Sequence, residues 1–130
     1  VQIVEWDMPE TGIFHILTEG VSRFRVVETR ARADGLLVGQ VELLSAETAC
    51  PVPESMQLAV EILRHIADEL GPAPFAGGGG RMRFNDAVWV GYRLAEILPL
   101  PLAVRQQLLE TDDSEARLAT LTGYLRQQIN

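Results

Sequence analysis

Residues 94–118 read LAEILPLPLAVRQQLLETDDSEARL, and two prolines divide this stretch into separate predicted helices. Proline lacks an amide hydrogen and clashes with the preceding turn, so Pro99 ends a helix whose N-cap is Asn85 or Asp86. The fixed φ angle of proline suits a first helical turn, and Pro101 therefore starts a second helix. The stretch predicts short helices joined by tight connections.

The second predicted helix extends to about Glu110, and a capping box marks the start of another. The Asp112 side chain can accept a hydrogen bond from a free backbone amide in the first turn of a helix. Glu115 follows three residues later, which is the spacing of a capping box. Side chains that can form a buried face then recur at helical spacing: Leu118, Leu121, Thr122 and Leu125. We expect a helical bundle with Trp89 and Leu121 inside.

Upstream of this stretch, the sequence predicts one more helix and a glycine-rich loop. Pro53 suits the first turn of the helix, and Gly71-Pro72 ends it. Between these positions apolar side chains recur at helical spacing: Ala59, Ile62, Leu63, Ile66 and Leu70. The following loop contains four consecutive glycines, Gly77 to Gly80, whose backbone entropy opposes a fixed conformation. We therefore expect this loop to be flexible.

The first third of the chain predicts about four antiparallel strands connected as a meander. Apolar or alternating segments, separated by turn residues, cover residues 1–6, 13–18, 21–28 and 36–44. We expect a turn at residues 7–12, a tight connection at Glu19-Gly20 and a hairpin turn at Asp34-Gly35. In the third segment two faces alternate, with Ser22, Phe24, Val26 and Glu28 opposing Val21, Arg23, Arg25 and Val27.

A change in composition marks a boundary between two lobes. Residues 45–53 are small or polar and include two prolines, which is typical of a linker. We therefore expect a β-lobe over residues 1–48 and a helical lobe over residues 53–130, which together form one domain.

The charge balance narrows the class of partner. The chain has 11 basic and 18 acidic residues and a net charge of -7, whereas nucleic-acid binders cluster positive charge. Every basic residue is arginine, and without lysine a Walker A loop, a Schiff base and a Ser-Lys dyad are all excluded. No apolar run approaches the roughly 18 to 20 residues of a membrane helix. We expect neither nucleic acid nor a membrane as a partner.

No local motif indicates catalysis or metal binding. His15, His65 and Cys50 are too widely spaced to form a zinc ligand pair, and Cys50 lies between prolines rather than at an activating helix start. The glycine tract is neither preceded by a strand nor followed by Lys, as a phosphate-binding loop would be. We therefore expect no enzyme activity, no cofactor and no metal.

One set of residues predicts a binding surface. Trp6 and Phe14 offer aromatic rings, and Arg23 and Arg25 offer guanidinium groups on one strand face. Such groups can hold an extended or unfolded peptide through stacking and carboxylate pairing. An edge strand protected by its charges is the alternative interpretation. The weakly charged strand at residues 1–6 also favours a homodimer that pairs unprotected edges.

Three segments resemble the N-terminal domain of the Lon protease family. Residues 14–26, FHILTEGVSRFRV, have the family's apolar run, its turn ending in Gly and its Arg-apolar-Arg-apolar pattern, and residues 38–44, VGQVELL, are similar to the next element. The helical stretch 94–118 is the more specific part. There one helix closes on Leu-Pro-Leu, a short helix ends in Leu-Leu-Glu, and the last helix opens with Arg-Leu.

The resemblance covers nearly the whole chain and implies an α+β fold in which a partial PUA-like antiparallel β-barrel precedes a helical bundle. It also implies a non-catalytic domain that recruits unfolded or tagged polypeptides in the cytoplasm. The family's opening strands have no counterpart before Val1, so we expect a short stand-alone bacterial Lon-domain protein that is truncated at its N-terminus. An RNA-binding PUA-like module and a structural interaction domain are the alternatives.

Overall fold

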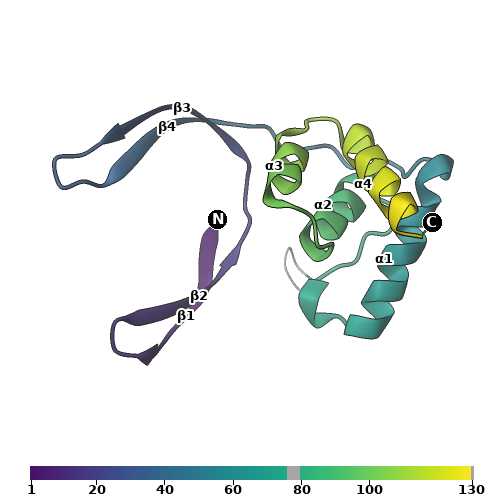
Figure 1. The fold of residues 1–130 in the computed structure, drawn as a ribbon, viewed down its shortest axis with the longest axis horizontal. Coiled ribbons are helices and arrows are strands. Elements are labelled where there is room, and N and C mark those ends of the chain that lie inside the picture. Colours follow the sequence, from purple (N-terminus) through teal and green to yellow (C-terminus); the bar gives the residue numbers. More distant parts are fainter. Residues whose placement is uncertain (76–79, 130) are drawn as a thin grey trace. The chain divides into compact units, whose positions relative to one another are not determined.

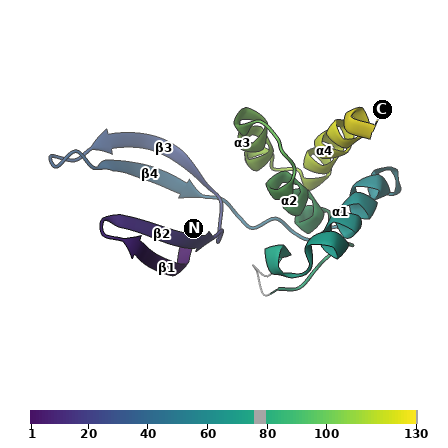
Figure 2. The same ribbon diagram turned by 60° about the horizontal axis from the view of Figure 1, so that its bottom comes forward.

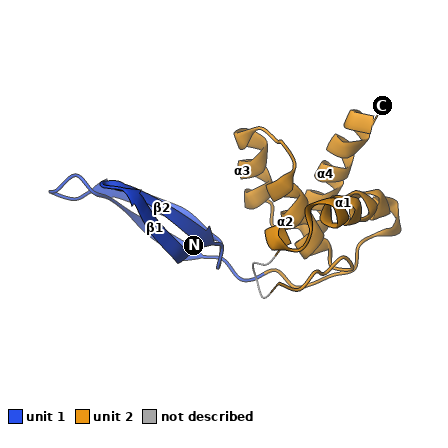
Figure 3. Ribbon diagram, turned by 90° about the horizontal axis from the view of Figure 1, so that it is seen from below, with its two compact units in different colours: residues 1–46 blue, residues 47–130 orange. Residues whose placement is uncertain are grey.

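A computed structural model describes residues 1–75 and 80–129, which form two compact units, residues 1–46 and residues 47–130 (Figure 3). The described residues contain two small antiparallel sheets and four α-helices, which confirms the α+β class. Apart from Gly80, the glycine tract that was expected to be flexible lies outside the described residues.

The first unit consists of two β-hairpins (Figures 1 and 2). Their strands are β1 (Gln2–Glu10), β2 (Ile13–Glu19), β3 (Phe24–Ala31) and β4 (Leu37–Leu43). β1 pairs only with β2, and β3 pairs only with β4, so the predicted four-stranded meander is wrong. Each hairpin turn contains a glycine with positive φ, Gly12 in the first and Gly35 in the second, whereas Gly20 does not adopt positive φ. The chain therefore leaves the first sheet at Gly20 and starts a second one.

Two irregularities in the strands also differ from the sequence prediction. β1 extends to Glu10, whereas the sequence predicted that it ends near Trp6. The register shifts between Asp7 and Glu10, so Pro9 lies outside the regular ladder. Its missing amide hydrogen therefore breaks no hydrogen bond between the strands. In β3 the pairing shifts between Val26 and Glu28. This bulge places Val26 and Glu28 on opposite faces, whereas strict alternation predicted that they share one.

The second unit is a helical bundle. A 3-10 turn (Glu54–Met56) leads into α1 (Gln57–Leu70), a second 3-10 turn (Ala73–Phe75) follows, and the bundle is completed by α2 (Ala87–Ile97), α3 (Leu102–Glu110) and α4 (Ser114–Ile129). α2 packs against α1 and α4. The largest buried apolar side chains of the core are Phe75, Leu63, Leu94, Leu118, Leu121 and Val90. Trp89 is partly buried against this core.

The helix ends are set by caps and by prolines, as the sequence indicated, with one correction. The Asp86 side chain caps α2 by accepting from the Val88 amide at 3.0 Å. At α4, however, Asp113 rather than Asp112 is the cap, and its carboxylate accepts from the Glu115 amide at 2.9 Å. The Asp113 carbonyl also accepts the first helical bond of α4, so the helix begins one residue later than the motif suggested.

A buried arginine connects three parts of the helical unit. The Arg117 side chain has no exposed surface, its Nε donates to the Leu108 carbonyl at 3.0 Å, and its guanidinium also donates to the Thr111 carbonyl. These carbonyls lie at the end of α3, where the helix no longer supplies a full set of amide partners, although the Leu108 carbonyl also accepts from the Thr111 amide at 3.3 Å. The guanidinium lies 4.3 Å from the ring centre of Tyr92 in α2. Arg117 therefore joins α4 to α2 and α3.

The same arginine holds the start of the unit in place. Arg117 pairs with the Glu47 carboxylate at 2.9 Å, and the Tyr92 hydroxyl donates to the other oxygen of that carboxylate. Further along, the Cys50 amide donates to Asp86 at 3.3 Å and the Cys50 carbonyl accepts from the Ala87 amide at 2.8 Å. Residues 47–51 are thus bound to the helices.

Leu121 provides a test of the helical core, because its side chain is 1% exposed. Leu121→Ala should lower the free energy of unfolding by about 2 to 5 kcal/mol, through lost burial and the cavity left behind. Leu102→Ala, at a position that is 82% exposed, is the matched control and should change it little. Chemical denaturation of both variants measures the difference, and equal losses would place Leu121 outside the core.

The Arg117–Glu47 pair provides a second test. Glu47→Ala leaves a buried guanidinium without its counter-charge and should cost about 3 to 5 kcal/mol of unfolding free energy. Replacing both partners with apolar residues, Glu47→Leu with Arg117→Met, should restore much of that loss, because no charge then remains buried. If the double variant is as unstable as the sum of the single ones, the hydrogen bonds to the α3 carbonyls matter more than the ion pair.

Candidate functional site

The β1–β2 hairpin carries an exposed aromatic pair. The rings of Trp6 and Phe14 lie 6.0 Å apart between centres with a tilt of 50°, and the residues are 68% and 62% exposed. Trp6 stands opposite Ile16 in the strand register, and Ile3 stands opposite Thr18. Since alternate residues of a strand share a face, one side of this hairpin presents Ile3, Trp6, Phe14 and Ile16. We call these four residues the apolar hairpin face.

The opposite side of the same hairpin is more polar. Asp7 stands opposite His15, and Glu5 stands opposite Leu17. The hairpin is therefore amphipathic, with its aromatic residues on one side and two carboxylates on the other. Sequence reasoning identified Trp6 and Phe14 but missed Ile3 and Ile16. Alternation alone would have placed Ile16 with Phe14, whereas Ile3 shares a face with Trp6 only because the register shifts between Ile3 and Glu5.

Arg23 and Arg25 belong to the second hairpin. Arg25 stands opposite Glu42 in the β3–β4 register, where opposite charges favour the pairing. Arg23 precedes β3, and its carbonyl accepts from the Leu44 amide at 3.0 Å. The structure thus brings Trp6 and Phe14 together, while Arg23 and Arg25 are in a different sheet.

The second hairpin is amphipathic as well. Because Val26 pairs with Val41 and Phe24 pairs with Leu43, these four apolar side chains share one face, away from Arg25 and Glu42. None of the residues 1–46 is buried within the unit. Outside this unit, the exposed large apolar side chains of the described chain are limited to Leu70, Leu102, Leu109 and Ile129. Exposed apolar surface of this extent is typical of a region that binds other polypeptide.

The polar side chains that the sequence singled out do not assemble into a reactive centre. His65 pairs with Glu69 at 3.3 Å on the surface of α1, and the Cys50 sulfur lies 3.1 Å from the Ser114 hydroxyl. Over residues 1–75 and 80–129, no three His, Cys, Asp or Glu side chains come close enough to hold a metal ion. In the same residues no helix combines the length and apolar character needed to cross a membrane.

Comparison with known proteins gives consistent results. A curated Lon protease from Paraburkholderia phytofirmans is 32% identical over 114 residues, which are 85% of this chain and 14% of that protein. The crystal structure of a Lon N-terminal domain protein from Xanthomonas campestris superposes with a TM-score of 0.76 at 29% identity, covering 95% of this chain and 64% of the other. The chain is therefore shorter than both relatives.

The family comparison matches the same region of the chain. Residues 1–127 match the family described as the ATP-dependent protease La (LON) substrate-binding domain, which includes both the hairpins and the helical bundle. The resemblance seen in the strand pair and in the helical stretch is thereby confirmed. This chain belongs to the LON substrate-binding domain family.

Proposed function

We propose that this chain is a non-catalytic binding domain that recruits extended or unfolded polypeptide through its hairpin unit. The observation that carries the proposal is the apolar hairpin face, with its adjacent and exposed Trp6 and Phe14 rings, in a member of a substrate-binding family. Unfolded polypeptides expose the apolar side chains that folded proteins bury, so an open apolar surface favours them.

Two further interactions can contribute to this binding. Each two-stranded sheet leaves backbone amides and carbonyls at its outer edges, and an extended peptide can add there as another strand. Arg23 and Arg25 can contribute by pairing with acidic side chains of the client, in competition with partners within the chain such as Glu42 opposite Arg25, since guanidinium groups bind carboxylates in two-pronged geometry. Neither interaction depends on a particular client sequence, because one uses the backbone and the other uses charge alone.

We also propose that the two hairpins form part of a PUA-like β-barrel wall. Both are amphipathic, as barrel walls are, and both contain register shifts of the kind that bend strands. A bound polypeptide would occupy the open side of such a wall and cover its apolar face. The client would then supply the strand pairing that the two hairpins do not supply to each other.

The absence of catalysis is part of the same proposal. The chain has no lysine, and its two histidines, His15 and His65, belong to different units. A peptidase needs a nucleophile and a base within hydrogen-bonding distance of each other. Incubation with an unfolded substrate, with and without ATP, should therefore leave the substrate intact on a gel.

The apolar hairpin face can be tested with paired substitutions. Trp6→Ser and Phe14→Ser should each weaken binding of a fluorescently labelled, carboxymethylated unfolded protein by roughly ten-fold or more, because each side chain contributes about 1.5 to 3 kcal/mol when covered. Leu102→Ser removes an apolar side chain from α3 that is even more exposed, at 82%, and should leave the Kd unchanged. Equal Kd values for all variants would remove this face from the binding surface.

Strand addition at β1 can be tested independently. Without a client, two copies should pair along their exposed edges, and sedimentation at micromolar concentration should show a homodimer that an excess of extended peptide dissociates. Ile3→Pro removes one amide from β1 and should shift the population toward monomer. Peptide binding that persists after N-methylation of alternate peptide amides would show that backbone pairing is not involved.

A further inference from the structure

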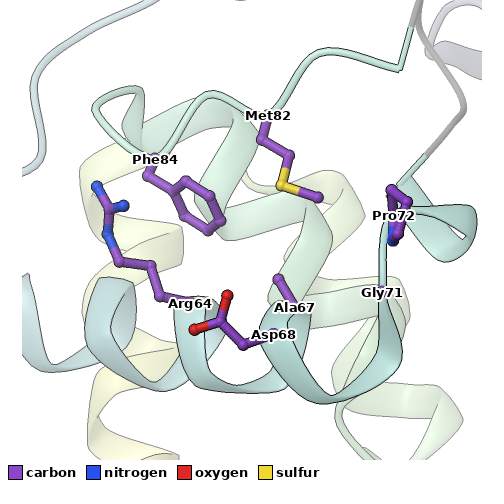
Figure 4. Close-up of a pocket in the computed structure, with 7 residues that line it drawn as sticks. All are labelled: Arg64, Ala67, Asp68, Gly71, Pro72, Met82 and Phe84. Carbon is purple, nitrogen blue, oxygen red and sulfur yellow. The ribbon is translucent and has the colours of Figure 1, made fainter.

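The helical unit contains an open groove of about 370 Å³ between α1 and the segment that precedes α2 (Figure 4). Arg64, Ala67 and Asp68 line it from α1, and the remaining lining residues are Gly71, Pro72, Met82 and Phe84. In Figure 4 the side chains of Met82 and Phe84 point toward α1. This surface belongs to a different unit from the hairpins and has no part in the function proposed above.

The wall of the groove is apolar and is held by the core. Phe84 packs edge-on against Trp89, with 5.3 Å between the ring centres, and Trp89 also contacts the buried Phe75. Phe84 and Met82 are only partly buried, so each presents part of its surface to the groove. An apolar wall that is fixed from behind and open in front can receive one apolar side chain of a ligand.

One arginine, Arg64, lines this wall, and two more, Arg81 and Arg83, flank Met82 in the sequence. The guanidinium of Arg64 lies 4.4 Å from the centre of the Phe84 ring, while Arg81 and Arg83 are exposed on either side of Met82. Within the described residues, none of these three arginines pairs with a carboxylate, although the chain has a net charge of -7. Three unpaired guanidinium groups beside an apolar wall form a complementary surface for carboxylates.

The backbone beside the groove is also available for pairing. Residues 81–83 have neither helical nor strand structure, and their one backbone hydrogen bond to a described residue is from the Asp86 amide to the Arg83 carbonyl at 3.0 Å. Their amides can therefore donate to the carbonyls of an extended chain lying along them. The opposite side of the groove is formed by α1, whose backbone groups are satisfied within the helix.

We infer that this groove is a second polypeptide-binding site, selective for an acidic segment that contains an aromatic or large aliphatic residue. The apolar side chain packs against Met82 and Phe84, and neighbouring Asp or Glu side chains pair with Arg64, Arg81 and Arg83. Asp68 is the one acidic residue that lines the groove, and its carboxylate repels the carboxylates of the same ligand. Neutral substitutions at Arg64 and Asp68 should therefore change the affinity for an acidic peptide in opposite directions. A merely structural role of either residue does not predict this.

The test uses the full chain and fluorescein-labelled decapeptides followed by fluorescence anisotropy. The probe has a central Phe flanked by Asp residues, and a matched peptide replaces each Asp with Asn. Arg64→Gln should weaken binding of the acidic probe about three- to ten-fold, and Asp68→Asn should strengthen it about two- to five-fold. Neither change should alter the Kd of the Asn peptide by more than about two-fold.

Controls separate this site from net charge and from the hairpins. Arg126→Gln removes the same charge from α4, at a residue that does not line the groove, and should leave the Kd of the acidic probe unchanged. Arg64→Gln and Asp68→Asn are also measured in a Trp6→Ser background, where binding at the hairpin site is weakened and both effects should persist. Phe84→Leu should weaken both peptides, and its melting temperature shows whether the loss reflects the groove or unfolding.

Specific outcomes would overturn the inference. If Arg64→Gln and Arg126→Gln weaken binding of the acidic probe equally, the effect comes from the net charge of the chain and not from the groove. A loss of binding in Trp6→Ser alone would assign the acidic probe to the hairpin unit. A weaker Kd for Asp68→Asn would contradict the proposed sign of the electrostatic contribution.

Discussion

The helical unit depends on one buried charge, the guanidinium of Arg117. Its desolvation is compensated by the carboxylate of Glu47, by two carbonyls at the end of α3 and by the ring of Tyr92. Each of these partners comes from a different part of the unit, so the helices and the segment that precedes them are fixed by the same side chain. An apolar residue at position 117 would fill the space without specifying which partners surround it.

The hairpin unit lacks such an organising residue. Isolated two-stranded hairpins are marginally stable in water, and here no side chain of residues 1–46 is buried within the unit. A surface that stabilises its own fold by burying its apolar side chains cannot also offer them to a client, so the exposed hairpin faces suit the binding role proposed above. The partners of Arg117 described here all lie within the helical unit, whose core is built without the hairpin side chains.

Local signals in the sequence were sufficient to predict the helices. Pro99, Pro101 and Gly71 act through their own backbone restrictions, so helix ends near these residues could be predicted without knowing the tertiary structure. The shift of the α4 cap from Asp112 to Asp113 is a small error within the same motif. Trp6 and Phe14 could be predicted as a pair from the sequence. The bulge in β3 could not, because it depends on how β3 pairs with β4, and the alternation of side chains along one strand carries no information about that pairing. The role of Arg117 was missed because Glu47 is 70 residues away in sequence.

The two binding sites proposed above would together offer a physical route to selectivity for unfolded clients. A linker between two binding segments converts the second binding event into an intramolecular one, which can raise the apparent affinity by about 10² to 10⁴ without any new contact. A folded protein buries most of its apolar segments and cannot bring one of them to the hairpins while offering an acidic, apolar segment to the groove. An unfolded chain of sufficient length can do both, because its segments are independent and its backbone is unpaired. With both proposed sites in use, discrimination would arise from chain flexibility and length more than from recognition of any one sequence.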